Sequence, residues 1–499
     1  QLYGDEKDWN RLVDVVMRLA GFVDDPKQRA KYLHTAAIVQ ARQLGQVDAA
    51  LELFEQVIEL DPTLVKAFSE AVEINRNRKD FNAVERLLRI KLDRAVQSGA
   101  VPAQLEAYAA LVELYERDLG WLDYALNALE SAAQLDPNNL ERTKHIAELA
   151  SRDPAHHLER ALQAYMKIIH AEPQRLVETY RTMRRLHTET KNADAAWCLC
   201  QSLAVLGYAD PDEERFYKRM RAETAAPAQA VFTEPDWLAV THSDTDPLLT
   251  SLFALIEPAV LASRTPELAS LGYPLSQAID LSQTPAPMTQ TLFYAAGVMG
   301  IAAPPAFIIR DDPGGLSFLH ARTPGIGLGR VAMSDKVPPQ AAAFIAARHL
   351  SYTRPGFYLR QLLSNATGLK AWLFAAIKLI SPQFPIAPDM EGPVREAMSA
   401  LDNALRGSAR DELARLVSTL LSDGAALDLK KWVTAVDLSA DRTGFVLAHD
   451  LETAAQIIKA SDDSSSAIPR TDRLRLLALF AVSPEYLGMR DRLRIRIDS

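Results

Sequence analysis

Cysteine is almost absent from this chain: Cys198 and Cys200 are the only two in 499 residues. They stand two positions apart in a helical pattern, so their side chains point about 200° apart around the helix axis. This spacing argues against a disulfide between them, and two thiols make no complete metal site. We interpret both as small apolar core residues. Because low cysteine content is typical of a reducing compartment, we expect a cytoplasmic location.

Glycine is also scarce, at 21 residues, which argues against a chain built from β-turns, barrels or glycine-rich phosphate loops. We therefore expect mostly helix. No apolar run reaches the roughly 18–20 residues that a membrane span requires. The longest candidates, Ala371–Ile380 and Ala341–Ala347, are interrupted by Lys378 or followed by Arg348. The sequence therefore predicts no membrane span.

Charge of one sign is not concentrated anywhere along the chain. There are 55 basic and 64 acidic residues, a net charge of −9, and no long basic block, which argues against nucleic-acid binding. With 48% hydrophobic and 24% charged residues the composition is that of a folded protein. The length exceeds what one ordinary core accommodates, so we expect several folding units or a repeat array.

A repeated pattern runs through the first half. The stretch from Leu44 to Asp61-Pro62 recurs from Leu119 to Asp136-Pro137, and a third copy ends at Glu172-Pro173. Each copy has a small residue, which lets two helices approach closely, and a bulkier residue four positions later, which fills the next groove. These pairs are Ala50 and Phe54, Ala125 and Leu129, Ala161 and Tyr165, and Ala196 and Cys200.

This pattern resembles the tetratricopeptide repeat family, whose period is about 34 residues. About five copies cover residues 31 to 207, with Glu213–Arg221 as a capping helix. Residues 8–21 resemble the second helix of an earlier copy, so we expect the array to begin before this sequence does. The resemblance implies a solenoid with a protein-binding groove and no catalytic apparatus of its own. We expect six positions to face that groove, although they could equally be ordinary solvated residues: Thr35, Val39, Arg42, Ser69, Glu73 and Arg76.

Residues 222–235 lose the repeat pattern and carry two prolines, which marks a boundary. We therefore predict a repeat array over 1–221, a linker over 222–235 and a second domain over 236–499. In the second domain the pattern predicts helices such as Leu248–Leu261 and Met288–Met299, together with three short strands. A mainly helical α+β domain with a small sheet follows. The strands are expected at 306–310, 316–321 and 326–329, before a helix at 340–352.

The order of elements around the sheet resembles the zinc metallopeptidases of the HtpX and CAAX-prenyl-protease kind. The likeness covers about residues 245–460 and rests on the three strands before the helix Pro339–Tyr352 and on the segment Val436–Gly444. In that family the first helix carries two zinc-binding histidines four residues apart and a catalytic glutamate. A later segment supplies a third ligand and an aspartate that orients a histidine.

At these positions the chain departs from the family. Arg348 and Tyr352 replace the two histidines, His349 replaces the catalytic glutamate, Asp437 stands at the third ligand, and only Asp441 is retained. Arginine repels a metal cation, and tyrosine is a poor zinc ligand at neutral pH. We expect Arg348 to form a buried ion pair with Asp437 and Asp441 that replaces the metal as the link between two helices.

The resemblances together predict a non-catalytic adaptor without metal or cofactor that binds protein partners of a larger assembly. The degenerate cleft would still hold a peptide along an edge strand, through Leu316, Phe318 and His320. Three alternatives stay open: a metallopeptidase with a rebuilt metal site using His349 and Asp437, a coincidental likeness, and a second domain that only caps the solenoid. The sequence indicates neither the partner nor the oligomeric state.

Overall fold

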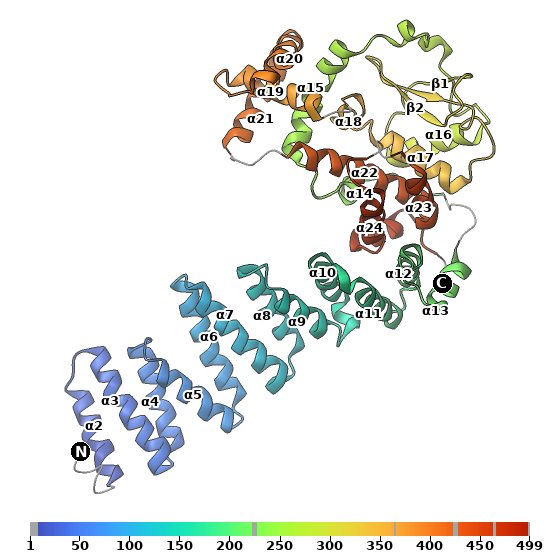
Figure 1. The fold of residues 1–499 in the computed structure, drawn as a ribbon. Helices are drawn as coiled ribbons and strands as arrows, with labels where there is room; N and C mark the ends of the chain where they lie inside the picture. The colour runs from blue at the N-terminus through green and yellow to red at the C-terminus, as the bar shows by residue number, and fades with distance from the viewer. Residues whose placement is uncertain (1–7, 222–226, 364–365, 423–427, 463–465, 498–499) are drawn as a thin grey trace. The chain divides into compact units, whose positions relative to one another are not determined.

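The computed structural model describes residues 8–221, 227–363, 366–422, 428–462 and 466–497, and it is mainly helical with one small sheet (Figure 1). This confirms the predicted helical fold class. Contacts divide the chain into two compact units, Gln1–Pro173 and Gln174–Ser499. We describe each unit by itself.

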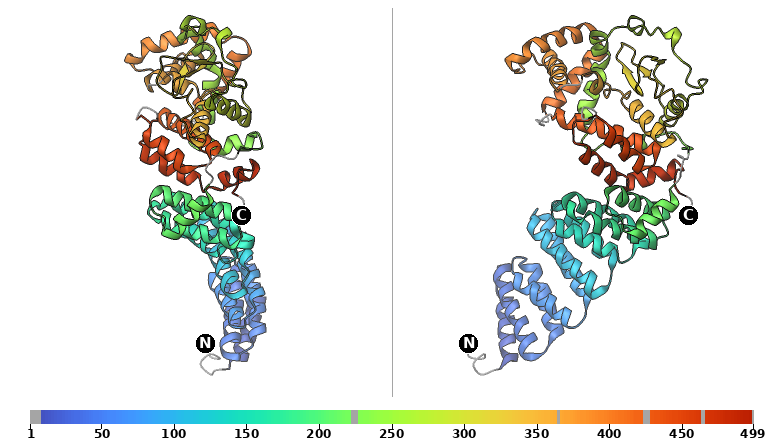
Figure 2. Two further views of the ribbon diagram at one scale, coloured as in Figure 1. Left: turned by 90° about the vertical axis from the view of Figure 1, so that its right-hand side faces the viewer. Right: turned by 45° about the vertical axis from the view of Figure 1, so that its right-hand side comes forward.

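The first unit is a row of helical hairpins in which each helix packs on its neighbours in the sequence (Figure 2). The expected early helix is present as α2. The helices are α2 (Trp9–Gly21), α3 (Pro26–Val39), α4 (Val47–Leu60), α5 (Val65–Asn77), α6 (Phe81–Gln97), α7 (Val101–Glu113), α8 (Leu122–Leu135), α9 (Leu140–Ala150) and α10 (Pro154–Ala171).

The turn inside two of the hairpins explains the repeated Leu-Gly pair. The first helix widens into a π-helical turn, at Gln40–Leu44 and again at Leu114–Leu119. Gly45 and Gly120 follow with φ of 65° and 67°, a left-handed conformation that glycine adopts without steric cost. The next helix then begins two residues later, so the repeat boundary is set locally.

The packing predicted for the repeats is confirmed, except that Tyr165 is only partly buried. The small residues Ala50, Ala125 and Ala161 are fully buried, and the bulkier Phe54 and Leu129 lie in the same cores. A small side chain at each crossing lets the two helices of a hairpin approach closely, and the larger one fills the adjoining space.

The second unit begins with a fifth hairpin, α11 (Leu176–Glu189) and α12 (Ala193–Leu206), and with α13 (Pro211–Met220), which is the expected capping helix. Every side chain of α12 from Asp194 to Leu203 is buried, because later helices cover it. Cys198 and Cys200 are free and buried in this helix, and burial raises the pKa of the two thiols to about 12 and about 11.

Polar contacts hold this hairpin to the end of the chain. The Asp194 carboxylate accepts 2.8 and 2.7 Å hydrogen bonds from Arg490, and it also accepts one from the backbone N–H of Ile497. The Tyr180 hydroxyl donates to the carbonyl of Ala478 at 3.1 Å. The contacts therefore group the fifth hairpin with the C-terminal helices. The predicted division of the chain at 222–235, of which 222–226 lie outside the described residues, stays a prediction.

Three short strands form one sheet in the order β1-β3-β2. The sequence predicts the three strands but not their order. They are β1 (Ala306–Ile308), β2 (Leu316–Leu319) and β3 (Gly325–Leu328). The strands β1 and β2 are shorter than expected, whereas β3 has the expected length and begins one residue earlier. β1 runs parallel to β3, and β2 runs antiparallel to it. Because β2 pairs with a strand on one side only, it is an edge of the sheet.

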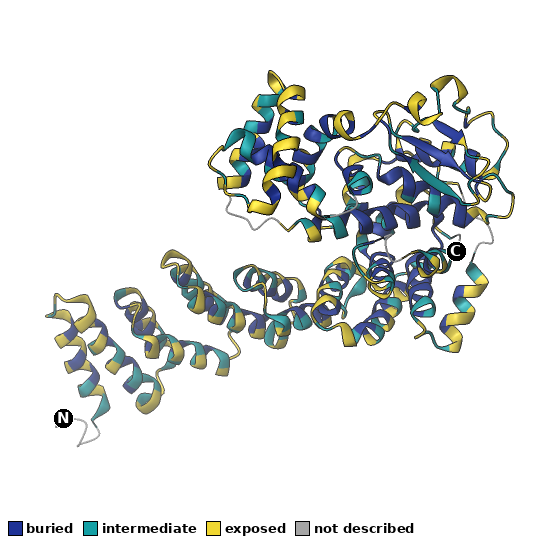
Figure 3. Cartoon of the chain, turned by 45° about the horizontal axis from the view of Figure 1, so that its top comes forward, coloured by how far each residue is buried: buried dark blue, intermediate teal, exposed yellow. Residues whose placement is uncertain are grey.

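Helices surround the sheet and form a second cluster beside it. α22 (Leu429–Ala448) contributes to both clusters: Trp432 and Val436 pack with α15 and α19–α21, whereas Phe445 packs with the sheet side (Figure 3). The remaining helices are α14 (Glu234–Val240), α15 (Pro247–Arg264), α16 (Pro287–Met299), α17 (Pro339–Ser351), α18 (Leu359–Leu362), α19 (Ala366–Ile380), α20 (Glu391–Ala404), α21 (Ser408–Ser422), α23 (Leu451–Ala460), α24 (Arg470–Phe480) and α25 (Pro484–Arg492).

Among the described helices, α15 alone is long and apolar enough to be considered as a membrane span. The longest apolar runs in the sequence, Ala371–Ile380 and Ala341–Ala347, lie elsewhere in the chain. Leu252, Phe253 and Ile256 of α15 are fully buried against α19–α21, so its apolar character is accounted for by a core position. No described helix is a strong candidate for a span.

The close crossing at Ala125 gives a test of the repeat packing. An Ala125→Trp substitution should destabilise the first unit by about 1–3 kcal/mol or more, because the fully buried methyl group leaves no space for an indole. Hydrogen exchange should show the loss of protection strongest in α7–α10. Tyr124→Trp, at the exposed neighbouring position, is the matched control. Equal melting temperatures for the two variants would contradict this packing.

Candidate functional site

The helices α17 and α22 cross antiparallel at very short range, which brings the predicted site positions together. A Cβ atom at Gly444 would lie 2.8 Å from the carbonyl oxygen of Phe344 and 3.2 Å from the Cβ of Arg348. Only a glycine accommodates this approach. One and two turns before it on α22 stand Asp441 and Asp437, opposite the last turns of α17.

Four of the five predicted positions form one hydrogen-bonded network. Arg348 Nε donates to Asp441 Oδ1 at 2.7 Å, and its Nη2 donates to the Tyr352 hydroxyl at 3.2 Å. The Tyr352 hydroxyl in turn donates to Asp437 Oδ1 at 2.9 Å. The predicted link between the two helices is therefore present. Arg348 pairs directly with Asp441, and the Tyr352 hydroxyl connects it to Asp437.

Two further arginines complete the network, and the sequence reasoning missed both. Arg360 on α18 donates to Asp437 Oδ2 at 3.1 and 3.3 Å. Arg473 on α24 makes two 2.8 Å hydrogen bonds to the carboxylate of Asp441. In the sequence, each of these residues is visible only as an arginine within an apolar helical segment. That pattern does not indicate which carboxylate the arginine pairs with.

The two carboxylates of the network are shielded from water. Asp437 and Asp441 are 0% and 1% exposed. Burial raises the pKa of Asp437, while the charges of Arg360 and Arg348 act in the opposite direction. Burial also opposes the charge of Arg348, but Tyr352 and Asp441 outweigh it and raise the pKa of Arg348. Each carboxylate thus has several donors, as a buried charge requires.

His349, the fifth predicted position, points away from this network. Its ring stacks on Phe318 of β2 with centroids 3.8 Å apart and planes inclined by 12°. The ring is 8% exposed, and its Nε2 has no hydrogen-bond partner among the described residues. Burial, assisted by Arg348 and His320, lowers the pKa of His349 to about 3, so the ring is neutral at physiological pH.

The three predicted cleft residues lie on the edge strand and its continuation. Leu316 and Phe318 belong to β2, and His320 follows it, with its Nδ1 2.9 Å from the Tyr358 hydroxyl. Burial lowers the pKa of His320.

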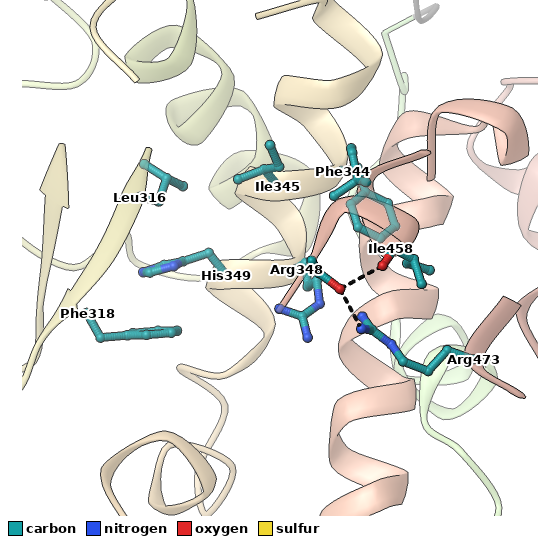
Figure 4. Close-up of a pocket in the computed structure, with 10 residues that line it drawn as sticks. Leu316, Phe318, Phe344, Ile345, Arg348, His349, Ile458 and Arg473 are labelled. Atoms are coloured by element: carbon teal, nitrogen blue, oxygen red, sulfur yellow. Dashed lines mark hydrogen bonds between the residues drawn. The ribbon is translucent and has the colours of Figure 1, made fainter. Parts of the chain in front are cut away.

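A cavity of about 190 Å³ lies between this strand and α17 (Figure 4). Most of its wall is apolar, and the polar groups that reach it come from α17, from the end of α23 and from α24. Its lining residues are Leu316, Phe318, Phe344, Ile345, Arg348, His349, Ile457, Ile458, Ser461 and Arg473.

In the first unit, the two arginines among the predicted groove positions form ion pairs between successive repeats. Arg42 pairs with Glu70 at 2.5 Å, and Arg76 lies 3.7 Å from Asp118 and 3.9 Å from Glu113. These partners all lie on the first helices of neighbouring hairpins or on their last turns.

The other four groove positions are placed differently. The hydroxyl groups of Thr35 and Ser69 donate to backbone carbonyls one turn back on their own exposed helix faces. Glu73 is exposed. Val39 is a correction: it is only 8% exposed and packs in the repeat core, because it lies on the buried face of α3 together with Ala36. Whether the exposed positions bind a partner stays a prediction.

A hollow that the sequence did not indicate lies one repeat further on, between α7 and α9. Its volume is about 500 Å³, and Tyr108, Val112 and Arg142 are among its lining residues. His145 on α9 lies 2.8 Å from Glu116, so the rim is polar. The hollow therefore combines apolar and charged lining residues.

Comparison with known proteins supports the repeat assignment. The sequence model of the tetratricopeptide repeat family matches residues 30–64, which span most of α3 and the whole of α4. No curated protein matches the chain. Within the described ranges, no three His, Cys, Asp or Glu side chains lie together in a way that could hold a metal ion.

Arg360 gives a test of the buried network. Arg360→Leu should lower the free energy of unfolding by about 3–5 kcal/mol, because it leaves the Asp437 carboxylate buried without its arginine. Adding Asp437→Asn should recover much of this loss. The control is Arg322→Leu, which removes a surface pair with Glu267 and should change stability by about 0.5 kcal/mol or less. Urea unfolding measures all four proteins, and equal effects of the two single variants would contradict the network.

The low pKa of His349 predicts that acid destabilises the folded chain. Its pKa is about 3 in the folded chain against 6.5 for an unperturbed histidine, so below pH 6.5 the unfolded state takes up a proton that the folded state does not. Stability should therefore fall by up to about 1.4 kcal/mol per pH unit from this group between pH 6 and 4. His349→Phe keeps the stacked ring and should lack this contribution. Parallel pH profiles of unfolding for the two proteins would contradict the assignment.

Proposed function

We propose that this chain is a non-catalytic adaptor that binds protein partners through its helical repeats and through the open edge of its small sheet. One observation carries the proposal. The four positions Arg348, Tyr352, Asp437 and Asp441 are committed to one another and to two further arginines. This arrangement supplies a structural link between helices and offers no group poised for nucleophilic or acid–base work.

The repeat unit supports the adaptor role. Tetratricopeptide-like hairpins present their first helices as a continuous surface for binding proteins, and the family match over 30–64 falls on one of them. The hollow between α7 and α9 extends the surface beyond the predicted groove positions. The buried free thiols are in keeping with a reducing compartment, and we propose a cytoplasmic location.

We further propose that the second half is a degenerate metallopeptidase-like domain. In its support, the positions matched to the first histidine and to the orienting aspartate, Arg348 and Asp441, are hydrogen-bonded to each other. The positions matched to the second histidine and the third ligand, Tyr352 and Asp437, are likewise bonded. Arg348 stands at the position of the first zinc-binding histidine, and it contacts Asp441, the position of the aspartate that orients a histidine in that family.

The alternative is a metallopeptidase with a rebuilt metal site at His349 and Asp437. Two observations weigh against it. The His349 ring lies flat on Phe318, toward the sheet. Both Asp437 oxygens are already engaged, one by Tyr352 and the other by Arg360. A shared metal would require both groups to abandon these contacts.

Metal analysis tests the proposal in two directions. Replacing the four positions together, by Arg348→His, His349→Glu, Tyr352→His and Asp437→Glu, should create zinc binding at micromolar concentration if the resemblance is real, because the ligand set is then complete. The wild-type chain should carry no stoichiometric zinc. A folded quadruple variant that binds no zinc would contradict the peptidase likeness. Stoichiometric zinc in the wild type that is lost on His349→Ala would overturn the adaptor proposal.

A further inference from the structure

Three aromatic side chains gather at the turn between α7 and α8, and we call them the aromatic cluster. The ring centroids of Trp121 and Tyr124 lie 5.3 Å apart, and that of Tyr115 lies 6.1 and 5.4 Å from them. Tyr115 is buried, whereas Trp121 and Tyr124 are 37% and 49% exposed. Leaving two large rings in contact with water forgoes the stabilisation that their burial would give.

The turn itself does not require the two exposed rings. The hairpin of α3 and α4 makes the same turn, with a π-helical end followed by a left-handed glycine. Counted from that glycine, the positions of Trp121 and Tyr124 are occupied there by Gln46 and Ala49. The rings therefore have a role other than forming the turn. Exposed tryptophan and tyrosine are enriched among the residues that dominate the energy of protein–protein contacts.

The two turns also differ in charge. The stretch 113–123 has four acidic residues and one arginine, whereas the matching stretch 38–48 has one of each. Three of the four acids, Glu113, Glu116 and Asp118, pair with arginines. On the buried side of the cluster, the Tyr115 hydroxyl donates to Glu85 at 2.8 Å, and Arg89 neutralises that carboxylate.

Asp123, the fourth acid, has no such counter-charge. It stands between the two exposed rings in the first turn of α8, and its side chain is 72% exposed. The described residue that pairs with it is His157, at 3.6 Å. At the matching position of the other turn, Asp48 pairs with Arg78 at 2.6 Å. The aromatic cluster thus has an exposed carboxylate beside it that lacks an arginine.

We infer that the aromatic cluster and Asp123 bind an arginine or lysine side chain of a partner protein. This inference rests on the proposed function, and it names the chemistry that one surface of the repeats recognises. The faces of aromatic rings attract a cation, tryptophan most strongly, and a carboxylate beside them supplies the opposite charge. Arginine fits better than lysine, because its planar group stacks on a ring while its edge donates to a carboxylate.

Fluorescently labelled peptides test the inference on the full chain. The probes are blocked peptides of four Gly-Ser-Arg units, and matched peptides in which every arginine is replaced by lysine or by glutamine. Fluorescence anisotropy at about 150 mM salt should show binding of the arginine peptide. The lysine peptide should bind about threefold more weakly, and the glutamine peptide at least about tenfold more weakly.

Giving the cluster the residues of the other turn tests its role. Trp121→Gln together with Tyr124→Ala should weaken binding of the arginine peptide by about tenfold. The double variant should fold, because the same turn forms around Gln46 and Ala49. Asp123→Lys reverses the charge and should weaken binding by at least about tenfold, whether or not the double variant folds. Circular dichroism and thermal melting establish which variants are folded.

Two control variants match these changes. Tyr208→Ala removes a ring that is 55% exposed on the second unit, and Asp48→Asn removes the matching carboxylate of the other turn. Both should bind the arginine peptide as the wild type does. Weakening by the controls equal to that by the cluster variants would overturn the inference, because the attraction would then be spread over the whole acidic chain.

The remaining outcomes are equally decisive. Unchanged binding in the folded cluster variants would overturn the inference and leave the adaptor proposal standing, because another surface would then bind the peptide. Equal binding of the arginine and glutamine peptides, or no binding by the wild type, would also overturn it. So would a wild-type dimer that the double variant dissociates in sedimentation, because a second copy would then occupy the cluster. Failure of the adaptor proposal would appear separately, as stoichiometric zinc in the wild type.

Discussion

Two carboxylates one turn apart on α22 are buried where water does not reach them, and the second unit is arranged around them. A buried carboxylate destabilises a fold by several kcal/mol unless charged donors surround it. Asp441 therefore requires Arg348 and Arg473, and Asp437 requires Arg360 and the Tyr352 hydroxyl. These donors come from α17, α18 and α24, so one pair of acids fixes the relative positions of four helices. These contacts require α17 to lie close to α22. A glycine at position 444 permits this approach because it has no Cβ atom.

The two units are stabilised in different ways. In the first, every helix contacts its neighbours in the sequence, and alanines at the crossings give a core that is local and repetitive. In the second, the end of the chain returns to cover α12, and the buried pair of Asp194 and Arg490 joins residues far apart in the sequence. Local stacking tolerates local damage, whereas a buried ionic contact fails when either partner is removed.

The same network bears on function. Arg348 joins α17 to Asp441 on α22, and the cavity beside this contact is lined by Phe318 and His349. Under the proposed function, the edge of β2 and the helical repeats are the two surfaces that bind partners.

The sequence by itself determined the local structure of this protein. The Leu-Gly turns, the small-then-bulky pairs and the short strands could be predicted because each depends on residues within one or two helical turns. Arg348, Tyr352, Asp437 and Asp441 could be named as a group because the resemblance aligned two segments.

Only the tertiary structure decided which arginine meets which aspartate, that His349 turns to the sheet, and that Val39 is buried. Arg360 and Asp437 are 77 residues apart, and no periodicity connects them. Helical spacing fixes the direction of a side chain relative to its own axis. Which residue that side chain contacts depends on how separate helices pack, and this packing is determined by the burial of apolar side chains throughout the core.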